Sequence, residues 1–264
     1  VPLALVKQAK ENPLKITLIT GASLGNDLDK QLTEAGVLAR RLPFQVDNTL
    51  RKAINNGEVM FIDQHLSETV EQMRNLQLKK PDVAIIEAIA ITEDGGIIPT
   101  TSVCNSPSFA IFAEKVIVEI NTNLSPAFEG LHDIYIPSYR PTRQAIPLTQ
   151  VDERIGTHAI NIDPSKIVGI VINNEYHDSP STVTEPDDET QGIANHLINF
   201  FEQEVAAGRL PKDLGPLQAG IGSIANAVLT GLKDSNFDDL VMYSEVLQDC
   251  TFELIDAGKM KFAS

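Results

Sequence analysis

The apolar residues of this chain occur in short runs separated by amphipathic segments. Compact apolar runs over 15–21 and 83–91 predict buried parallel strands, because a strand covered on both faces reads as a continuous hydrophobic stretch. Shorter apolar runs predict further strands at 59–63, 97–98, 115–120, 167–172, 240–243 and 259–262. Helical periodicity and helix-start residues predict helices at 28–39, 50–55, 107–113, 187–207 and 223–232, with another beginning at 67.

Strands alternate with helices at least five times, so we expect an α/β fold with a mainly parallel open sheet and flanking helices. A first α/β domain is expected to occupy 1–213. A second α/β domain is expected to begin at 214, with only its first units present in 214–264. In the helix 187–207, the residues expected to form the packing face are Ile193, Leu197, Phe200 and Phe201.

The C-terminal part of the chain combines a glycine turn with a carboxylate. The turn 220–222 opens into a predicted helix, and Glu245 follows a predicted strand. Two neighbouring glycines let backbone N–H groups approach a ligand, and the helix N-terminus adds partial positive charge. Open α/β sheets place functional residues at the carboxyl ends of their strands. Taken alone, the turn also fits an ordinary strand-to-helix connection, and Glu245 also fits a helix N-terminal charge.

Composition narrows the classes of partner. The chain has 21 basic and 36 acidic residues, a formal net charge of −15, which argues against nonspecific binding to nucleic acid or to an anionic membrane. An anionic ligand must therefore find local donors, since the overall field repels it. Two cysteines, Cys104 and Cys250, exclude a disulfide framework and indicate a reducing compartment. No apolar run reaches the roughly 20 residues of a transmembrane helix.

Other polar residues fit both a functional and a structural interpretation. Glu87 interrupts a strand, where a carboxylate needs partners. Cys104 as a nucleophile needs an activating histidine that the sequence does not place nearby. Arg140 and Arg143 fit anion contacts or ordinary surface arginines, and His177 lies among carboxylates without the spacing of a metal site. The glycine loop 21–27 lacks the full dinucleotide fingerprint, which favours a plain βα turn.

Two segments carry a family resemblance. The residues 217–228 (LQAGIGSIANAV) and 243–249 (YSEVLQD) resemble, in wording, order and separation, the acetyl-CoA hydrolase/CoA-transferase family, particularly its acetate and succinate CoA-transferases. The resemblance extends through 82–121 and 140–156. It implies that Glu245 is a nucleophile that becomes a glutamyl-CoA thioester. It also implies contacts with coenzyme A at Gly220, Ile221, Gly222, Ser223 and Ile224.

The resemblance has further implications and one departure. Arg154, in the D-x-R-I-G element, is expected to be a charge partner near the active cleft. The loop 99–106 is expected to face the coenzyme A cleft, although Cys104 stands where the family usually has glycine. No metal is implied, and a homodimer in the cytoplasm is expected, with a mitochondrial location open for a eukaryotic source. Because family members extend beyond both ends of this sequence, we expect an internal fragment that is inactive alone.

The implied reaction is transfer of coenzyme A between an acyl-CoA and a carboxylate, of the acetyl-CoA or succinyl-CoA type, in acetate metabolism. Hydrolysis of acetyl-CoA by the same covalent route is an alternative. A noncatalytic coenzyme A-binding module and a sugar-phosphate isomerase are two others. The complete sequence motif Y-S-E-V-L-Q-D favours transfer or hydrolysis, because a noncatalytic module does not need the glutamate.

Overall fold

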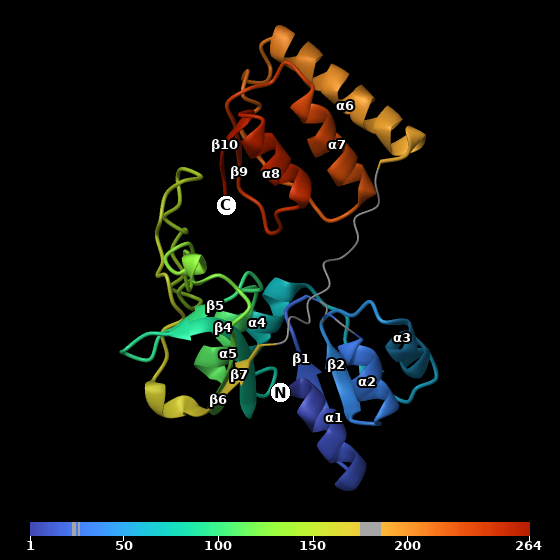
Figure 1. Cartoon of the computed structure of the whole chain (residues 1–264), viewed down its shortest axis with the longest axis vertical. Coiled ribbons are helices and arrows are strands. Elements are labelled where there is room, and N and C mark those ends of the chain that lie inside the picture. The colour runs from blue at the N-terminus through green and yellow to red at the C-terminus, as the bar shows by residue number, and fades with distance from the viewer. Residues whose placement is uncertain (23–24, 26, 175–185) are drawn as a thin grey trace. The chain divides into compact units, whose positions relative to one another are not determined.

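The computed structural model describes residues 1–22, 25, 27–174 and 186–264 (Figure 1). Its contacts divide the chain into two compact units. The first unit comprises Val1–Ala145 and Ile155–Ser179, and the second comprises Ile146–Arg154 and Pro180–Ser264. The second unit thus includes the long helix that precedes residue 213, so its extent differs from the predicted 214–264. The boundary between 213 and 214 stays a prediction about the folding domains.

The first unit contains a three-stranded parallel sheet near the N-terminus, with strand order β1-β2-β3. Its strands are β1 (Ile16–Ile19), β2 (Leu38–Leu42) and β3 (Met60–Phe61). Its helices are α1 (Pro2–Glu11), α2 (Leu28–Glu34) and α3 (Asn48–Asn55). The predicted helix 28–39 was too long, because α2 ends where Gly36 takes a left-handed conformation and the chain turns into β2. The sequence pattern also missed α1 and β2.

A second sheet in the same unit has four strands in the order β5-β4-β6-β7. It consists of β4 (Val83–Ile91), β5 (Ile97–Pro99), β6 (Lys115–Asn121) and β7 (Ile167–Asn173). The strands β4, β6 and β7 are parallel, and β5 returns antiparallel to β4, as the turn at 94–96 predicts. The helix α4 (Leu66–Arg74) precedes β4, and the helix α5 (Ser106–Phe112) follows β5.

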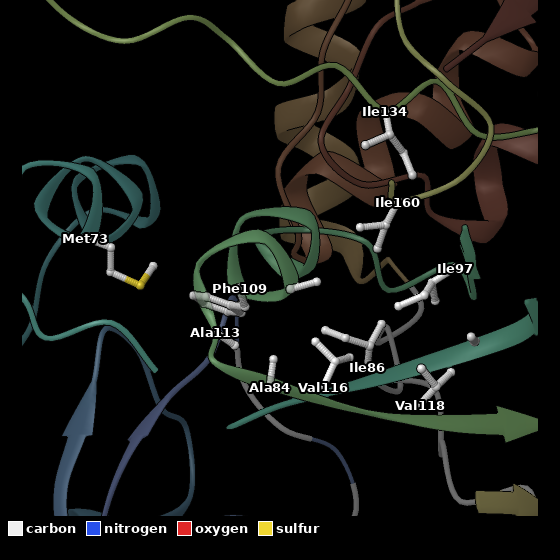
Figure 2. Packing of buried hydrophobic residues seen from close by; sticks show 12 residues of the cluster. Met73, Ala84, Ile86, Ile97, Phe109, Ala113, Val116, Val118, Ile134 and Ile160 are labelled. Atoms are coloured by element: carbon white, nitrogen blue, oxygen red, sulfur yellow. The ribbon is translucent and has the colours of Figure 1, made fainter. Parts of the chain in front are cut away.

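The core of this sheet lies on one face, against α5 (Figure 2). Phe109 of α5 packs in the same cluster as Ile86 of β4 and Val116 and Val118 of β6. On β4 the burial alternates, and Val83 and Ile85 are exposed. The prediction that this strand is buried on both faces was therefore wrong, because only one face of the sheet is covered within this unit.

The segment between β6 and β7 has little regular structure, as its lack of periodicity predicts. It contains two short 3₁₀ turns, η1 (Pro126–Phe128) and η2 (Pro164–Lys166). Single bridges join Ile134 to Thr157 and Ile97 to Ile160. The carboxylate of Asp133 accepts hydrogen bonds from the backbone N–H groups of Ile155 and Gly156. These contacts hold part of the irregular segment against β5.

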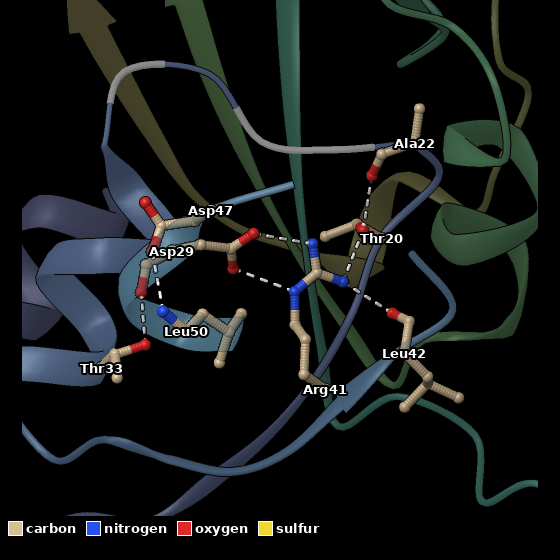
Figure 3. A network of polar contacts seen from close by, with 8 residues as sticks. All are labelled: Thr20, Ala22, Asp29, Thr33, Arg41, Leu42, Asp47 and Leu50. Atoms are coloured by element: carbon tan, nitrogen blue, oxygen red, sulfur yellow. Dashed lines mark hydrogen bonds and ion pairs between the residues drawn. The ribbon is translucent and has the colours of Figure 1, made fainter. Parts of the chain in front are cut away.

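A buried ion pair joins α2 to β2 (Figure 3). Arg41 is fully buried, and its Nε and Nη2 atoms donate to the two carboxylate oxygens of Asp29 at 2.9 and 3.1 Å. Its Nη1 donates to Thr20 Oγ1 and to the carbonyl of Leu42, both at 2.8 Å. Such bidentate pairing satisfies charges that would otherwise be costly to bury. The network therefore ties the ends of β1 and β2 to the first turn of α2.

The second unit is a parallel sheet of order β10-β9-β8 with three helices. Its strands are β8 (Pro216–Leu217), β9 (Leu240–Met242) and β10 (Met260–Ala263). Its helices are α6 (Asp188–Ala206), α7 (Ser223–Lys233) and α8 (Asp249–Asp256). Leu229, Leu232 and Leu254 pack with Leu240 and Met242 in its core. A mixed α/β fold with parallel sheets and flanking helices, as predicted, is thus present in both units.

The packing face of α6 differs from the predicted one. Ile193, Leu197 and Phe200 are exposed, whereas Phe201 packs against the core together with Ile198 and Val205. Ala194, fully buried, completes this face at helical spacing. The prediction chose its face by helical spacing, but this helix has a second apolar stripe at the same spacing, and that stripe meets the core. Among the described residues, no helix is both long and apolar enough to cross a membrane.

Replacing Arg41 by methionine is expected to destabilise the first unit. The Arg41→Met change leaves the Asp29 carboxylate buried without its partner, which costs about 3–5 kcal/mol of unfolding free energy. The double variant Arg41→Met/Asp29→Leu is expected to regain most of this loss. Urea denaturation of each variant measures the effect, with Arg51→Met, on the exposed side of α3, as a control. A single-variant loss no larger than that of the control contradicts the prediction.

Candidate functional site

The candidate site of the second unit consists of two loops at one edge of its sheet. The first loop, 218–222, follows β8, and the second, 243–248, follows β9. The two strands are parallel neighbours with Leu217 opposite Met242, and the Tyr243 N–H donates to the Leu217 carbonyl at 2.9 Å. Because parallel strands end at the same edge, the glycine turn and the Glu245 loop emerge side by side.

Ser244 connects the two loops directly. Its Oγ lies 3.1 Å from the Ala219 carbonyl and 2.9 Å from the Val246 carbonyl, and it accepts from the Ala219 N–H at 3.4 Å. Its single proton can serve one carbonyl at a time, so the three contacts form one shared network. The residue directly before Glu245 thereby holds the backbone that leads into the glycine turn.

Gln248 makes a second connection from the end of the same loop. Its side chain is buried, and Nε2 donates to the Gly220 carbonyl at 3.0 Å. Its Oε1 is also buried and has no hydrogen-bond partner among the described residues. Ser244 and Gln248 thus flank Glu245 and bind consecutive carbonyls of the glycine turn. Sequence reasoning singled out neither residue, although both belong to the segment Y-S-E-V-L-Q-D.

The glycine turn presents the N-terminus of α7. Gly222 is the residue before the helix and has φ +146°, a conformation that L side chains rarely adopt. The first N–H groups of the helix, including those of Ser223 and Ile224, have no intrahelical acceptor, and no side chain among the described residues caps this end. Ile221 and Ile224 are exposed. The turn therefore offers backbone donors and a positive helix end at the surface of the unit.

Glu245 lies beside this turn on the second loop. Its side chain is exposed, and among the described residues its carboxylate makes no ion pair or hydrogen bond. The structure therefore brings together in one unit all the predicted site residues: Gly220, Ile221, Gly222, Ser223, Ile224 and Glu245. The roles of these residues stay predictions.

The other residues considered from the sequence lie outside the two loops of the candidate site. Glu87 is a half-buried carboxylate that accepts from Thr100 Oγ1 at 3.2 Å and from Asn121 Nδ2 at 2.9 Å, so its partners are structural. Arg154 is in the second unit, and its expected role as a charge partner stays a prediction. The loop 21–27 in part, and His177, lie outside the described residues.

Cys104 occupies a position that suits glycine. Its φ is +37°, and a Cβ atom at Gly21 would lie 2.5 Å from its Sγ. Both observations explain why glycine would fit at position 104, and the expectation that the family usually has glycine here stays a prediction. Within the part of the chain that the structure describes, no three His, Cys, Asp or Glu residues are grouped so that they could hold a metal ion.

Comparison with known proteins places this chain in a family. A model described as the acetyl-CoA hydrolase/transferase N-terminal domain matches residues 1–172. The chain belongs to the acetyl-CoA hydrolase/transferase family. The matched residues end before the glycine turn and Glu245, so the family assignment rests mainly on the first unit.

Curated relatives extend the similarity over the whole chain. It is 44% identical to an acetyl-CoA hydrolase of Schizosaccharomyces pombe over 274 residues, covering all of this chain and 52% of the relative. It is also 44% identical to a succinyl-CoA:acetate CoA-transferase of Clostridium kluyveri over 266 residues, covering all of this chain and 49% of the relative. The chain spans about half the length of the curated relatives it matches.

Solved structures share the fold at lower sequence identity. RipA from Yersinia pestis aligns with a TM-score of 0.64 at 18% identity, over 97% of this chain and 52% of that one. A 4-hydroxybutyrate CoA-transferase from Porphyromonas gingivalis aligns with a TM-score of 0.55 at 19% identity, over 98% and 57%. These likenesses confirm the predicted CoA-transferase-like α/β fold.

Removing the Ser244 hydroxyl is expected to loosen the junction between the loops. Ser244→Ala leaves the Ala219 backbone groups without this partner and is expected to lower the unfolding free energy of the unit by about 1 kcal/mol. Urea denaturation measures the loss. Ser223→Ala is the control, since its hydroxyl makes no hydrogen bond with the described residues. Equal effects of the two changes would show that Ser244 does not join the loops.

The two cysteines are expected to differ in reactivity. Cys250 lies buried on α8, and burial raises the pKa of its thiol, so little reactive thiolate forms near pH 8. Cys104 is exposed. Iodoacetamide at pH 8 should therefore modify Cys104 first, as measured by peptide mass. Both cysteines should react in urea, and equal modification of the folded protein contradicts the burial of Cys250.

Proposed function

We propose that this chain carries the nucleophile and part of the coenzyme A site of an acyl-CoA:carboxylate CoA-transferase of the acetyl-CoA or succinyl-CoA type. The observation that carries the proposal is the pair of contacts from Ser244 and Gln248, which flank Glu245 and bind the carbonyls of Ala219 and Gly220. They keep an unoccupied carboxylate next to a turn rich in backbone donors. Family membership, and relatives named as a hydrolase and a transferase of CoA thioesters, support the assignment.

In the proposed reaction, the Glu245 carboxylate attacks the thioester carbonyl of an acyl-CoA. The C–S bond breaks, giving an acyl-glutamyl anhydride and the thiolate of coenzyme A. The thiolate then attacks the glutamyl carbonyl, releasing the first carboxylate and leaving a glutamyl-CoA thioester. An acceptor carboxylate reverses these two steps and leaves as the new acyl-CoA, so Glu245 is regenerated.

The glycine turn has a binding role in this scheme. The free backbone N–H groups at Gly220, Ile221, Gly222, Ser223 and Ile224 would donate to coenzyme A, which is a substrate here, and the N-terminus of α7 would favour its negative charge. This matters in an acidic protein, because the formal charge of −15 disfavours an anionic ligand elsewhere.

Hydrolysis of the acyl-CoA is the second candidate, because one relative is named a hydrolase and another a CoA-transferase. Water that reaches the anhydride or the glutamyl thioester converts transfer into hydrolysis without any change of nucleophile. Glu245 is exposed in this unit, so exclusion of water must come from the bound substrate or from other parts of the complete protein. We further propose that the complete protein is a homodimer that acts in the cytoplasm and needs no metal.

Trapping of the covalent intermediate tests the nucleophile. The complete protein is used, because this chain spans about half the length of its relatives. It is incubated with acetyl-CoA, reduced with borohydride, digested and analysed by peptide mass. Reduction of the Glu245 side chain to an alcohol is expected. Glu245→Gln should abolish the modification and lower kcat/KM by about 10³-fold or more.

A matched variant separates the nucleophile from other carboxylates. Glu253→Gln removes an exposed carboxylate of the same unit, paired with Lys233, and should leave both labelling and turnover unchanged. Repeating the reaction with and without acetate or succinate as acceptor distinguishes transfer from hydrolysis. Turnover without modification of Glu245, or turnover retained by Glu245→Gln, would falsify the covalent mechanism.

A further inference from the structure

Three arginines of the first unit converge on a single carboxylate. Arg74 Nη1 lies 3.2 Å from Glu71 Oε1, and Arg140 Nε lies 3.6 Å from Glu71 Oε2. Arg143 forms a further ion pair with Glu71 Oε1 through Nη2. Glu71 and Arg74 are on α4, whereas Arg140 and Arg143 come from the irregular segment between β6 and β7. We call these four residues the arginine cluster.

The arginine cluster is locally positive in an acidic chain. Three guanidinium groups and one carboxylate carry a net charge of +2, against a formal charge of −15 for the whole chain. Among the described residues, Glu71 is the one carboxylate that pairs with these arginines. Two unneutralised positive charges held close together repel each other, and an anion placed between them removes this cost.

The three arginines differ in exposure, and this defines an open side. The Arg74 side chain is only 4% exposed, and its guanidinium lies 5.2 Å from the ring centroid of Tyr139. The side chains of Arg143 and Arg140 are 34% and 67% exposed. Arg74 and Glu71 therefore form a fixed base, and the other two guanidinium groups face solvent above it.

Most donors on the open side have no acceptor among the described residues. Arg143 uses Nε to donate to the Ser138 carbonyl at 3.3 Å and Nη2 to bind Glu71, which leaves the rest of its fork free. Arg140 makes an ion pair but no hydrogen bond with the described residues. Because each guanidinium has five N–H donors, an incoming oxyanion meets several of them at once.

The segment that carries these arginines is already ordered by its own contacts. Thr142 Oγ1 donates to the Tyr139 carbonyl at 3.2 Å, and the Gln144 N–H donates to Ser138 Oγ at 3.3 Å. With Glu71 holding both guanidinium groups, little conformational entropy remains to be lost on binding. A single arginine from this segment would be enough to anchor it on α4, so anchoring alone does not account for both Arg140 and Arg143.

We propose that the arginine cluster is a binding site for a phosphate group in its dianionic form. A phosphate monoester carries a charge of about −1.5 to −2 near pH 7, which matches the excess of +2, whereas a carboxylate would neutralise only half of it. Planar guanidinium forks pair with phosphate oxygens in a bidentate manner. The site does not rest on the function proposed for Glu245, which lies in the other unit.

Calorimetric titration with inorganic phosphate tests the site, with acetate at equal ionic strength as the comparison. The protein should bind phosphate saturably and more tightly than acetate. Arg140→Gln should weaken phosphate binding about tenfold, and Arg140→Gln/Arg143→Gln about a hundredfold. Arg140→Gln removes one ion pair with Glu71 but no hydrogen bond with the described residues, and it leaves in place the contacts that Thr142, Arg143 and Gln144 make within the segment. Arg209→Gln, which breaks an exposed pair with Glu204 in the other unit, should leave binding unchanged.

Two further ligands identify the source of the phosphate. If it belongs to coenzyme A, the double variant should weaken binding of coenzyme A but not of dephospho-coenzyme A, which lacks the 3′-phosphate. A different result is that coenzyme A and dephospho-coenzyme A bind equally well to the double variant and to the unaltered protein, whereas inorganic phosphate binds more weakly to the variant. The site then serves another phosphate-bearing ligand. Absence of saturable phosphate binding at millimolar concentration, or phosphate binding by Arg140→Gln and the double variant equal to that of the unaltered protein, overturns the proposal.

Discussion

The parallel pairing of β8 with β9 is the constraint on which the candidate site depends. It places Leu217 opposite Met242, so that the chain leaves both strands at one edge. From there, Ser244 and Gln248 reach back to the carbonyls of Ala219 and Gly220. A shift of one residue in this register would turn the side chains of one strand to the opposite face of the sheet and displace its loop relative to the other loop. The position of Glu245 is therefore a property of strand register as well as of its own loop.

Much of the fold could be predicted from the sequence, because apolar runs and turn residues mark most elements directly. The run 83–91 matches β4, and the turn at 94–96 matches the antiparallel return to β5. The strand β2 was missed because two arginines, Arg40 and Arg41, interrupt its apolar pattern. Arg41 is buried there by its pairing with Asp29, a tertiary contact that periodicity cannot reveal.

The candidate site shows the same division between local and nonlocal information. The glycine turn and Glu245 could be found from their sequence motifs and the spacing between them, and the structure brings them together. The contacts of Ser244 and Gln248 could not be predicted, because a serine and a glutamine in a loop give no sign of their partners 25 or 28 residues away. The packing face of α6 was also misjudged, since two apolar stripes of this helix have helical spacing and only the tertiary packing decides which one meets the core.

The close approach of Cys104 to Gly21 links the evolution of two positions that lie far apart in sequence. Any side chain at position 21 would overlap the cysteine sulfur, and the positive φ at position 104 is relieved most easily by glycine. Substitution at 21 therefore becomes tolerable only after residue 104 has lost its side chain. The residue at position 104 therefore determines which residues position 21 can hold.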